Sequence, residues 1–493
     1  MSKYIGITIG PIFSTMEMTS SPAGLWISSY MFSHLANLIC KGIAEKTDEE
    51  NIISPYYSKN NAPAKDGVGR YHDHIILKNV NLSLTEVNEI CSKAKMELAG
   101  LLGDNMTDFV DDYVRVSVFG FESGNKDPVS ASKEQFDCVE LAALIMPPLK
   151  ENPLLSMFDS RESGTLEGRN NNIKNAKLVS ENVDRDEWQL VNKKGSILTL
   201  EEISGFSGDN KLKVSDYYAI VRADGDGMGK ILAGLKEDSK IRNFSEKCIK
   251  YCTDISKTVK EYGGVTIYAG GDDLLAIVPV YSGKDKNIFS MIREINGKFQ
   301  GIFEQYKSYN NGKTPTVSFG VAVVYSRYPL YEALKLSADM LFGIAKNQGE
   351  EKNYTSIIFR KHSGQSEQLL IRNSSMNKII DLLKYVYASG IKNEIFLSSI
   401  NNKIRNFEKS FKFAFKQGKS VYDNLVNNTF DSTVQKDNWY VKKLAGFLWD
   451  IYSGEADVKV AKEYLSENID EKIIAFDYVV RIIKFFGEKS GKE

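Results

Sequence analysis

The pattern of apolar and polar residues predicts a first α/β unit at the N-terminal end of the chain. Residues 4–9 (YIGITI) form a short apolar run that stops at a glycine and a proline, as a buried strand does. Residues 113–121 (YVRVSVFGF) alternate between apolar and polar side chains, which is typical of a strand. Between them, the stretch around Trp26 and residues 83–102 repeat apolar side chains at helical spacing. This order of strand, helix, helix and strand predicts one domain over residues 1–147.

A second α/β unit is predicted at residues 215–372. Its pattern predicts strands at 217–223, 265–269, 274–280, 316–324 and 355–359, and helices at 240–262, 285–307 and 330–348. The succession contains the β-α-β-β-α-β order of the ferredoxin-like fold.

The two remaining stretches have different patterns. Residues 148–214 are rich in asparagine, glycine and charged side chains, which is typical of an inserted, partly flexible module. Residues 373–493 carry amphipathic segments such as WYVKKLAGFLWDIY and almost no strand signal, which predicts a C-terminal helical bundle. The expected fold class is therefore α/β (α+β), with two ferredoxin-like domains, an inserted module and a helical bundle.

Composition excludes some classes of function. The 63 basic and 64 acidic residues give a net charge of -1, so the chain has no basic coat for nucleic acid, although a local RNA patch is compatible with this charge. No apolar run approaches the roughly 20 residues of a membrane span, so we expect no membrane attachment. The five cysteines do not complete a zinc spacing, and we interpret them as thiols of a cytoplasmic protein. The segment 71–74 (YHDH) is interpreted as structural, because an HD-type nuclease needs further histidines and aspartates.

Two segments carry the candidate chemistry. Asp224 and Asp226 lie where a predicted buried strand opens into a glycine-rich turn, and Asp272 and Asp273 follow two glycines in a predicted hairpin. In a ferredoxin-like unit the two strands are neighbours, so four carboxylates would converge on one edge of the sheet. So much negative charge needs a cation, and Mg²⁺ (or Mn²⁺) suits hard oxygen ligands and phosphates. Two such ions can activate a hydroxyl and stabilise a leaving oxygen in phosphoryl transfer.

The glycines around these aspartates fit a nucleotide site. Three of them let the backbone approach a triphosphate, and two permit a tight hairpin with space above it. We assign nucleotide binding to Gly225, Gly227, Gly229, Lys230, Gly270 and Gly271. A calcium loop is the weaker interpretation, because the later bidentate glutamate is missing, and an ordinary β-turn does not explain both segments.

The segments YYAIVRADGDGMGK and VTIYAGGDDLLAIVPV resemble the second palm domain of the CRISPR polymerase family, the large subunit of type III CRISPR effectors. That domain is related to GGDEF-type cyclases, and the resemblance places Lys346 on the nucleotide phosphates. The N-terminal segment IGPIFSTMEMTSSPAGLWISSYMFS is similar to the first palm of the type III-B (Cmr) large subunit. The chain starts at the first palm, so we expect no HD nuclease domain.

The resemblance implies a Mg²⁺-dependent nucleotidyltransferase that makes an adenylate second messenger from ATP when the effector binds target RNA. The charged residues that usually precede Leu-Trp are replaced by SSPAG at 20–24, which suits an acceptor without a triphosphate. We therefore favour AMP joined to S-adenosylmethionine as the product. Its candidate acceptor-binding residues are Gly10, Ser20, Ser21, Trp26, Asp66 and Asp73, the two carboxylates being candidates to face the sulfonium.

Three alternatives stay open at this point. The chain could make cyclic oligoadenylates, serve as a catalytically silent scaffold of the effector, or act as a stand-alone diguanylate-type cyclase. As partners we expect the other subunits of a Cmr-type effector, guide RNA and target RNA through that complex, and ATP, with S-adenosylmethionine as a candidate second substrate.

Overall fold

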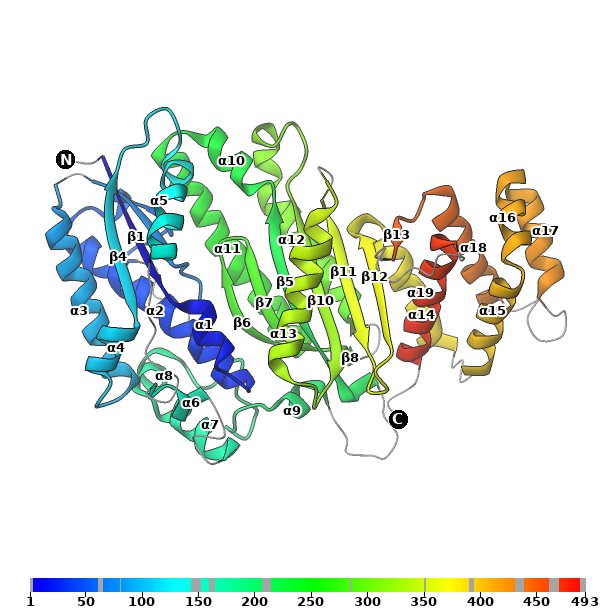
Figure 1. Cartoon of the computed structure of the whole chain (residues 1–493), viewed down its shortest axis with the longest axis horizontal. Coiled ribbons are helices and arrows are strands. Elements are labelled where there is room, and N and C mark those ends of the chain that lie inside the picture. The colour runs from blue at the N-terminus through cyan, green and yellow to red at the C-terminus, as the bar shows by residue number, and fades with distance from the viewer. Residues whose placement is uncertain are drawn as a thin grey trace.

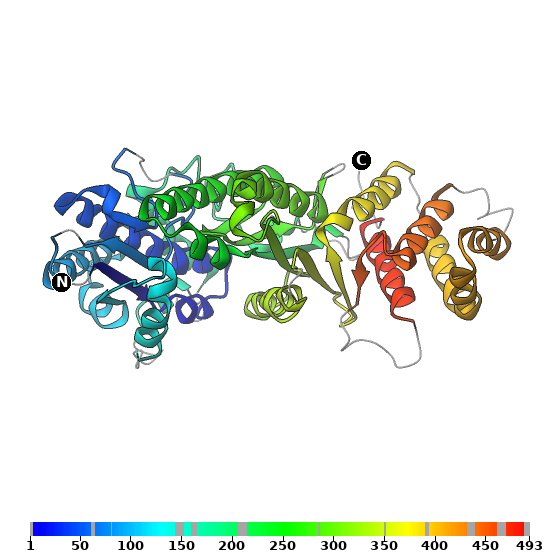
Figure 2. The same cartoon turned by 90° about the horizontal axis from the view of Figure 1, so that it is seen from above.

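In a computed structural model, two α/β domains lie side by side and a helical region follows beyond the second one (Figure 1). Seen from above, the three parts form a row along the longest axis (Figure 2). The structure describes residues 3–60, 65–79, 81–142, 152–158, 165–205, 214–283, 286–349, 352–389, 394–430, 439–460 and 470–487.

The first domain is a ferredoxin-like palm. Its elements are β1 (Tyr4–Gly10), α1 (Ile12–Glu17), α2 (Pro22–Lys46), β2 (Ile52–Ser54), β3 (His74–Lys78), α3 (Leu84–Leu102), α4 (Thr107–Tyr113), β4 (Arg115–Phe121) and α5 (Pro128–Ala142). The sheet has the order β2-β3-β1-β4, and all its pairings are antiparallel. The sequence pattern predicts β1 and β4, but it misses β2 and β3, because three and five residues are too few to show a period.

Helix α2 occupies the centre of the first palm. Ser21 caps its N-terminus by accepting a hydrogen bond from Gly24 N, and Pro22 takes the first helical position. Almost every side chain from Pro22 to Leu35 is buried, because α2 packs against β1, the inserted module and β6 of the second palm. A helix covered on so many sides carries apolar residues all round.

The second domain is a palm with a wider sheet. Its main elements are β5 (Tyr217–Asp226), α10 (Met228–Leu235), α11 (Asp238–Tyr262), β6 (Val265–Gly270), β7 (Asp273–Pro279), α12 (Ile288–Phe303), β10 (Thr316–Tyr325), α13 (Leu330–Ala338), β11 (Tyr354–Arg360) and β12 (Ser366–Arg372). A short hairpin of β8 (Tyr281–Gly283) and β9 (Lys286–Asn287) precedes α12. The sheet order is β13-β12-β11-β10-β5-β7-β6. Its four strands β10-β5-β7-β6 are the fourth, first, third and second of their unit, which is the order β4-β1-β3-β2 of the first palm. Both palms are therefore ferredoxin-like, as the sequence predicts for the pair.

The described part of the inserted module consists of short helices joined by turns, with a β-bridge between Val191 and Ile197. It contains α6 (Leu155–Phe158), α7 (Leu166–Asn175), α8 (Lys177–Asn182) and α9 (Leu200–Ser204). These helices pack on α2, α3 and the β5 and β7 strands, below the first palm in the view of Figure 1. The module thus covers the palms rather than standing apart from them.

The C-terminal part is mainly helical and continues the core of the second palm. It contains α14 (Met376–Ser389), α15 (Glu394–Asn406), α16 (Glu408–Gln417), α17 (Lys419–Thr429), α18 (Trp439–Ser453), β13 (Val458–Lys459) and α19 (Glu471–Gly487). The sequence shows almost no strand signal here, yet β13 pairs with β12 at the edge of the palm sheet. Phe485 of α19 packs its ring 5.9 Å from that of Phe359 of β11. Within the described residues, no helix is both long and apolar enough to cross a membrane.

Candidate active site

Two of the sequence-predicted carboxylates lie at the end of β5. The register pairs Asp224 with Ser318 and Asp226 with Thr316 of β10. Asp226 is buried, and its carboxylate accepts hydrogen bonds from Thr316 Oγ1 (2.9 Å), Ser318 Oγ (2.8 Å) and Asn353 N (3.1 Å). These donors hold one carboxylate in a fixed orientation inside the sheet edge.

Lys346 joins the two aspartates. It lies in the 3₁₀ turn Ala345–Asn347, and its Nζ is 2.9 Å from Asp226 Oδ1 and forms an ion pair with Asp224. The same Nζ donates a hydrogen bond of 2.7 Å to the carbonyl oxygen of Gly225. Burial, with the positive charge of Lys352, lowers the pKa of Lys346 to about 7. The structure thus places this lysine on the carboxylates, whereas the sequence resemblance assigns it to the nucleotide phosphates.

The hairpin between β6 and β7 brings in the second pair of carboxylates. Gly271 and Asp272 form its two-residue turn, and Gly271 has a φ of 66°, which favours glycine. Asp272 Oδ2 accepts a hydrogen bond of 3.1 Å from Gly225 N. A Cβ at Gly225 would lie only 2.6 Å from that oxygen, so this close approach of the hairpin to β5 requires glycine.

Burial and mutual repulsion raise the pKa values of these carboxyl groups. Burial raises the pKa of Asp226, against the hydrogen bonds of Ser318 and Thr316 that lower it. Burial also raises the pKa of Asp272 to about 6, and the charge of Asp226 adds to that rise. Asp273 has a pKa well above its usual range, because of burial first and Asp272 second. Such a group of like charges favours the arrival of a cation.

The donor set fits a divalent metal ion of the Mg²⁺ type. Asp224, Asp226, Asp272 and Asp273 offer hard carboxylate oxygens beside a glycine-rich turn, which are the ligands that Mg²⁺ prefers. Their ligand atoms are not gathered as three within 4.8 Å: in the described part of the chain, the only such group lies in the first palm. In this structure the ammonium of Lys346 balances the charge of Asp224 and Asp226.

A basic pocket opens next to Asp226. It has a volume of about 540 Å³ and extends along the strand ends of β5, β10, β11 and β12. Its lining includes four basic side chains, Lys230, Lys313, Lys352 and Arg372, together with Gly227 and Asn310. Gly227 has a φ of 83°, and a Cβ there would meet the Asn310 side chain at 2.7 Å. Cations beside a turn of backbone amides suit phosphate groups.

The sequence-predicted nucleotide residues fall into two groups. Gly227 and Lys230 line the pocket, whereas Gly225 lies within β5 and Gly270 and Gly271 lie at the β6–β7 hairpin. Gly229 is exposed at the first turn of α10, with open space where a Cβ would be. Sequence reasoning missed Thr316, Ser318, Asn353, Lys313, Lys352 and Arg372. Only Ser318 and Thr316 carried a signal, because they are the polar positions of the strand TVSFGVAVV.

The structure commits most of the candidate acceptor residues to the fold. Trp26 is 1% exposed, stacks on Tyr30 and donates a hydrogen bond of 2.6 Å to Gly67 O, so its face is covered. Ser20 Oγ accepts a hydrogen bond of 2.9 Å from Arg169, which is itself buried.

The other acceptor candidates differ in their burial and in the groups they contact. Ser21 is buried as the cap of α2, and Gly10 ends β1 at partial exposure. Asp66 forms an ion pair with Arg70 at 2.5 Å. Asp73 is the candidate that lies toward the hairpin of the second palm, because its charge raises the pKa of Asp273.

The segment before β3 joins the two palms. Gly69 O accepts a hydrogen bond of 3.1 Å from Ala269 N, and Gly69 forms a parallel bridge with Tyr268 of β6. Arg70 O lies 3.7 Å from the position of a Cβ at Gly270. Asp73 and the hairpin at residues 270–273 (the GGDD hairpin) therefore belong to one junction between the palms.

Comparison with known proteins identifies the palms. The model of the Cas10/Cmr2 second palm domain matches residues 217–356, and the model of the N-terminal region of the CRISPR-associated protein Cmr2 matches residues 4–97. The chain thus contains a second palm domain of the Cas10/Cmr2 type and an N-terminal region of the Cmr2 type. The Cmr subunit Cmr2 of Pyrococcus furiosus is 35% identical over 160 residues, which are 27% of this chain and 17% of that protein.

Two solved structures have a similar fold. A chain in the cryo-EM structure of the apo state of Type III-B Cmr-beta matches 99% of this chain and 82% of its own length, with a TM-score of 0.57 at 13% identity. A chain of a Csm1–Csm4 cassette in complex with pppApA matches 98% of this chain and 69% of its own, with a TM-score of 0.51 at 14% identity.

Proposed function

We propose that this Cas10/Cmr2 chain is the large subunit of a type III CRISPR effector and a Mg²⁺-dependent nucleotidyltransferase that uses ATP. The observation that carries the proposal is the adjacency of an acidic group and a basic pocket at one sheet edge. Asp226 belongs to both: it is ion-paired with Lys346, and it lines the pocket with Lys230, Lys313 and Lys352. Acidic ligands for metal next to cations for phosphate are what nucleotidyl transfer requires.

Each part of the site has a role in this reaction. The basic pocket binds the β- and γ-phosphates of ATP, and the acidic group faces the α-phosphate. An acceptor hydroxyl forms a bond to the α-phosphorus, the bond from the α-phosphorus to the bridging oxygen breaks, pyrophosphate leaves, and the hydroxyl proton passes to solvent. Mg²⁺ held by Asp224, Asp226, Asp272 and Asp273 would supply Lewis-acid stabilisation of the charge that develops on the phosphate oxygens.

Binding of ATP requires Lys346 to release the carboxylates. In the structure its Nζ is committed to Asp224, Asp226 and Gly225 O. A second cation at the carboxylates would repel the ammonium, which is then free to turn to the nearby phosphates. The role that the sequence resemblance gives to Lys346 and the position that the structure shows would then be two states of one side chain.

For the acceptor we propose S-adenosylmethionine, so that the product is AMP joined to S-adenosylmethionine. The support is the first-palm segment 20–24, where SSPAG replaces charged residues, and its neighbour Arg169 is buried and hydrogen-bonded to Ser20 and Phe158 O. A second triphosphate would need exposed cations at such a wall. The competing product is a cyclic oligoadenylate, which the Csm1–Csm4 structure with pppApA favours by fold likeness.

The decisive experiment identifies the product. The assembled effector, with guide RNA and target RNA, is incubated with Mg²⁺ and labelled ATP, with and without S-adenosylmethionine, and the products are resolved by mass spectrometry. A new adenylate that needs S-adenosylmethionine supports the proposed acceptor. Oligoadenylates from ATP alone would overturn that acceptor but retain the nucleotidyltransferase, and no product under either condition would favour the scaffold alternative.

A further inference from the structure

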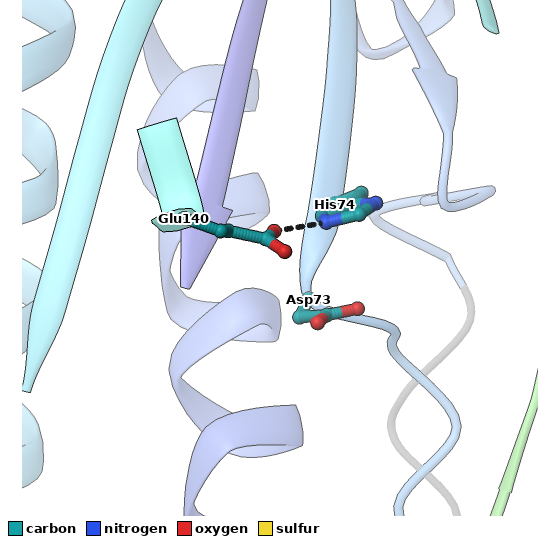
Figure 3. Close-up of side chains that lie close together, drawn as sticks. All are labelled: Asp73, His74 and Glu140. Atoms are coloured by element: carbon teal, nitrogen blue, oxygen red, sulfur yellow. Dashed lines mark hydrogen bonds and ion pairs between the residues drawn. The ribbon is translucent and has the colours of Figure 1, made fainter. Parts of the chain in front are cut away.

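A second group of metal-ligating side chains lies in the first palm. Asp73, His74 and Glu140 each offer one ligand atom, and these atoms lie within 4.8 Å of one another (Figure 3). His74 is the first residue of β3, Asp73 precedes it, and Glu140 reaches in from α5. Glu140 is 66 positions from His74 in the chain, so the segment 71–74, interpreted from sequence as structural, contains only two of these three ligands.

The position of the group repeats that of the GGDD hairpin. Both palms share one strand order, and β3 and β7 are their third strands. Asp73 and His74 stand at the start of β3 as Asp272 and Asp273 stand at the start of β7. This equivalence is independent of the side-chain distances. In the second palm that position carries the proposed metal ligands.

The side chains are held in place by their neighbours. The His74 ring stacks on Phe136 of α5 with centroids 4.1 Å apart and an angle of 6° between the planes. His74 Nε2 lies 2.6 Å from Glu140 Oε1, which also accepts a hydrogen bond of 2.7 Å from Thr8 Oγ1. In the described part of the chain, no side chain donates a hydrogen bond to the Asp73 carboxylate. An oriented imidazole and two carboxylates, one without a side-chain partner, are arranged as metal ligands are.

We propose that Asp73, His74 and Glu140 bind a divalent transition-metal ion at the junction of the palms. One imidazole nitrogen with two carboxylate oxygens suits Zn²⁺ or a similar borderline ion better than Mg²⁺, which prefers oxygen alone. Three protein ligands leave further coordination positions for water or a ligand. In this assignment Asp73 is a metal ligand rather than the carboxylate that faces a sulfonium.

The site is tested by Zn²⁺ binding to the full-length chain, which does not depend on the proposed activity. The protein is stripped with a chelator and titrated with Zn²⁺ by calorimetry in excess Mg²⁺, which keeps hard-oxygen sites filled. All proteins carry Cys138→Ser, because Cys138 is an exposed thiol on the same helix as Glu140. We expect one bound Zn²⁺, and loss of a ligand in His74→Gln or Glu140→Gln should weaken it by at least about tenfold.

Two controls make the outcome decisive. Glu134→Gln removes an exposed carboxylate from the same helix and should leave Zn²⁺ affinity unchanged, as should Asp272→Asn with Asp273→Asn. Zn²⁺ should also raise the melting temperature of the parent protein and not that of His74→Gln. Absence of binding to the parent, equal affinity in His74→Gln, or loss of Zn²⁺ with the Asp272 and Asp273 variant would each overturn the site. Glu140 is 46% exposed, so its variant reports on the site even if His74→Gln folds poorly.

Discussion

The Nζ of Lys346 lies 2.9 Å from Oδ1 of the buried Asp226, in an edge of sheet where negative charges crowd. An ammonium there does what a metal ion would do, since it balances the charge of the β5 carboxylates. Because two cations cannot share that space without repulsion, metal binding and release of Lys346 are coupled. The chain therefore carries an internal competitor for its own proposed metal.

The first prediction tests this competition. Lys346→Gln should bind Mn²⁺, used as a probe for Mg²⁺, more tightly by about tenfold, because the competing ammonium is gone. The same variant should bind ATP more weakly, because one phosphate contact is lost. Calorimetry with each ligand measures both changes. Lys335→Gln, on the exposed face of α13, is the matched control and should change neither. Unaltered Mn²⁺ affinity in Lys346→Gln would show that the lysine does not compete.

The second prediction concerns the charge of the hairpin. Asp272→Asn should lower nucleotidyl transfer by at least about a hundredfold, because a metal ligand is lost. Without metal the same variant should melt about 2 °C higher or more, because one of several crowded charges is removed. Product assays of the assembled effector and thermal unfolding in chelator measure the two effects. If activity falls and the melting temperature falls with it, the loss reflects folding, so Asp273→Asn must then be compared.

The third prediction concerns the basic pocket. Lys313→Gln and Lys352→Gln should each weaken ATP binding by about tenfold while AMP binding changes little, because the pocket cations contact the outer phosphates. Lys307→Gln is the control: it is exposed on the turn before the pocket and pairs with Glu304. Calorimetry with ATP and AMP separates the two nucleotides. Equal losses for ATP and AMP would place the outer phosphates elsewhere.

The sequence predicts β5, β6, β7, β10 and β11 of the second palm, because long periodic strands and helices alternate there, but it misses β12 and extends α13 beyond its end at Ala338. It located Asp224 and Asp272 at strand ends, but not the bond between Asp272 and Gly225 N, which depends on how the hairpin folds over β5. It also could not show that Ser318 turns its hydroxyl to Asp226, because that contact needs the register of β10 against β5.

Other parts of the site depend on contacts between distant segments. Lys313 and Lys352 reach the pocket from separate loops, and no local pattern marks them. Trp26 was predicted to take part in binding the acceptor. Tyr30 of the same helix stacks on the Trp26 ring, and Gly67 O accepts a hydrogen bond from its indole N–H; the contact with Gly67 depends on how distant segments pack.

The fourth prediction concerns pH and the buried His34 of α2. Burial, and to a lesser extent Lys41, lowers the pKa of His34 from 6.5 to about 4. Between about pH 6.5 and 4, the His34 imidazole is protonated in the unfolded chain but not in the folded chain. The free energy of unfolding therefore falls as the pH falls through that window. The loss attributable to His34 is about 3 kcal/mol at most, which is the full shift converted at 1.36 kcal/mol per unit. Denaturant unfolding at several pH values should show that the free energy of unfolding falls less steeply with falling pH in His34→Gln than in the parent. The variant His362→Gln, at an exposed position, should show the same pH dependence as the parent. Parallel pH profiles for the parent and His34→Gln would show that His34 does not resist protonation in the folded chain.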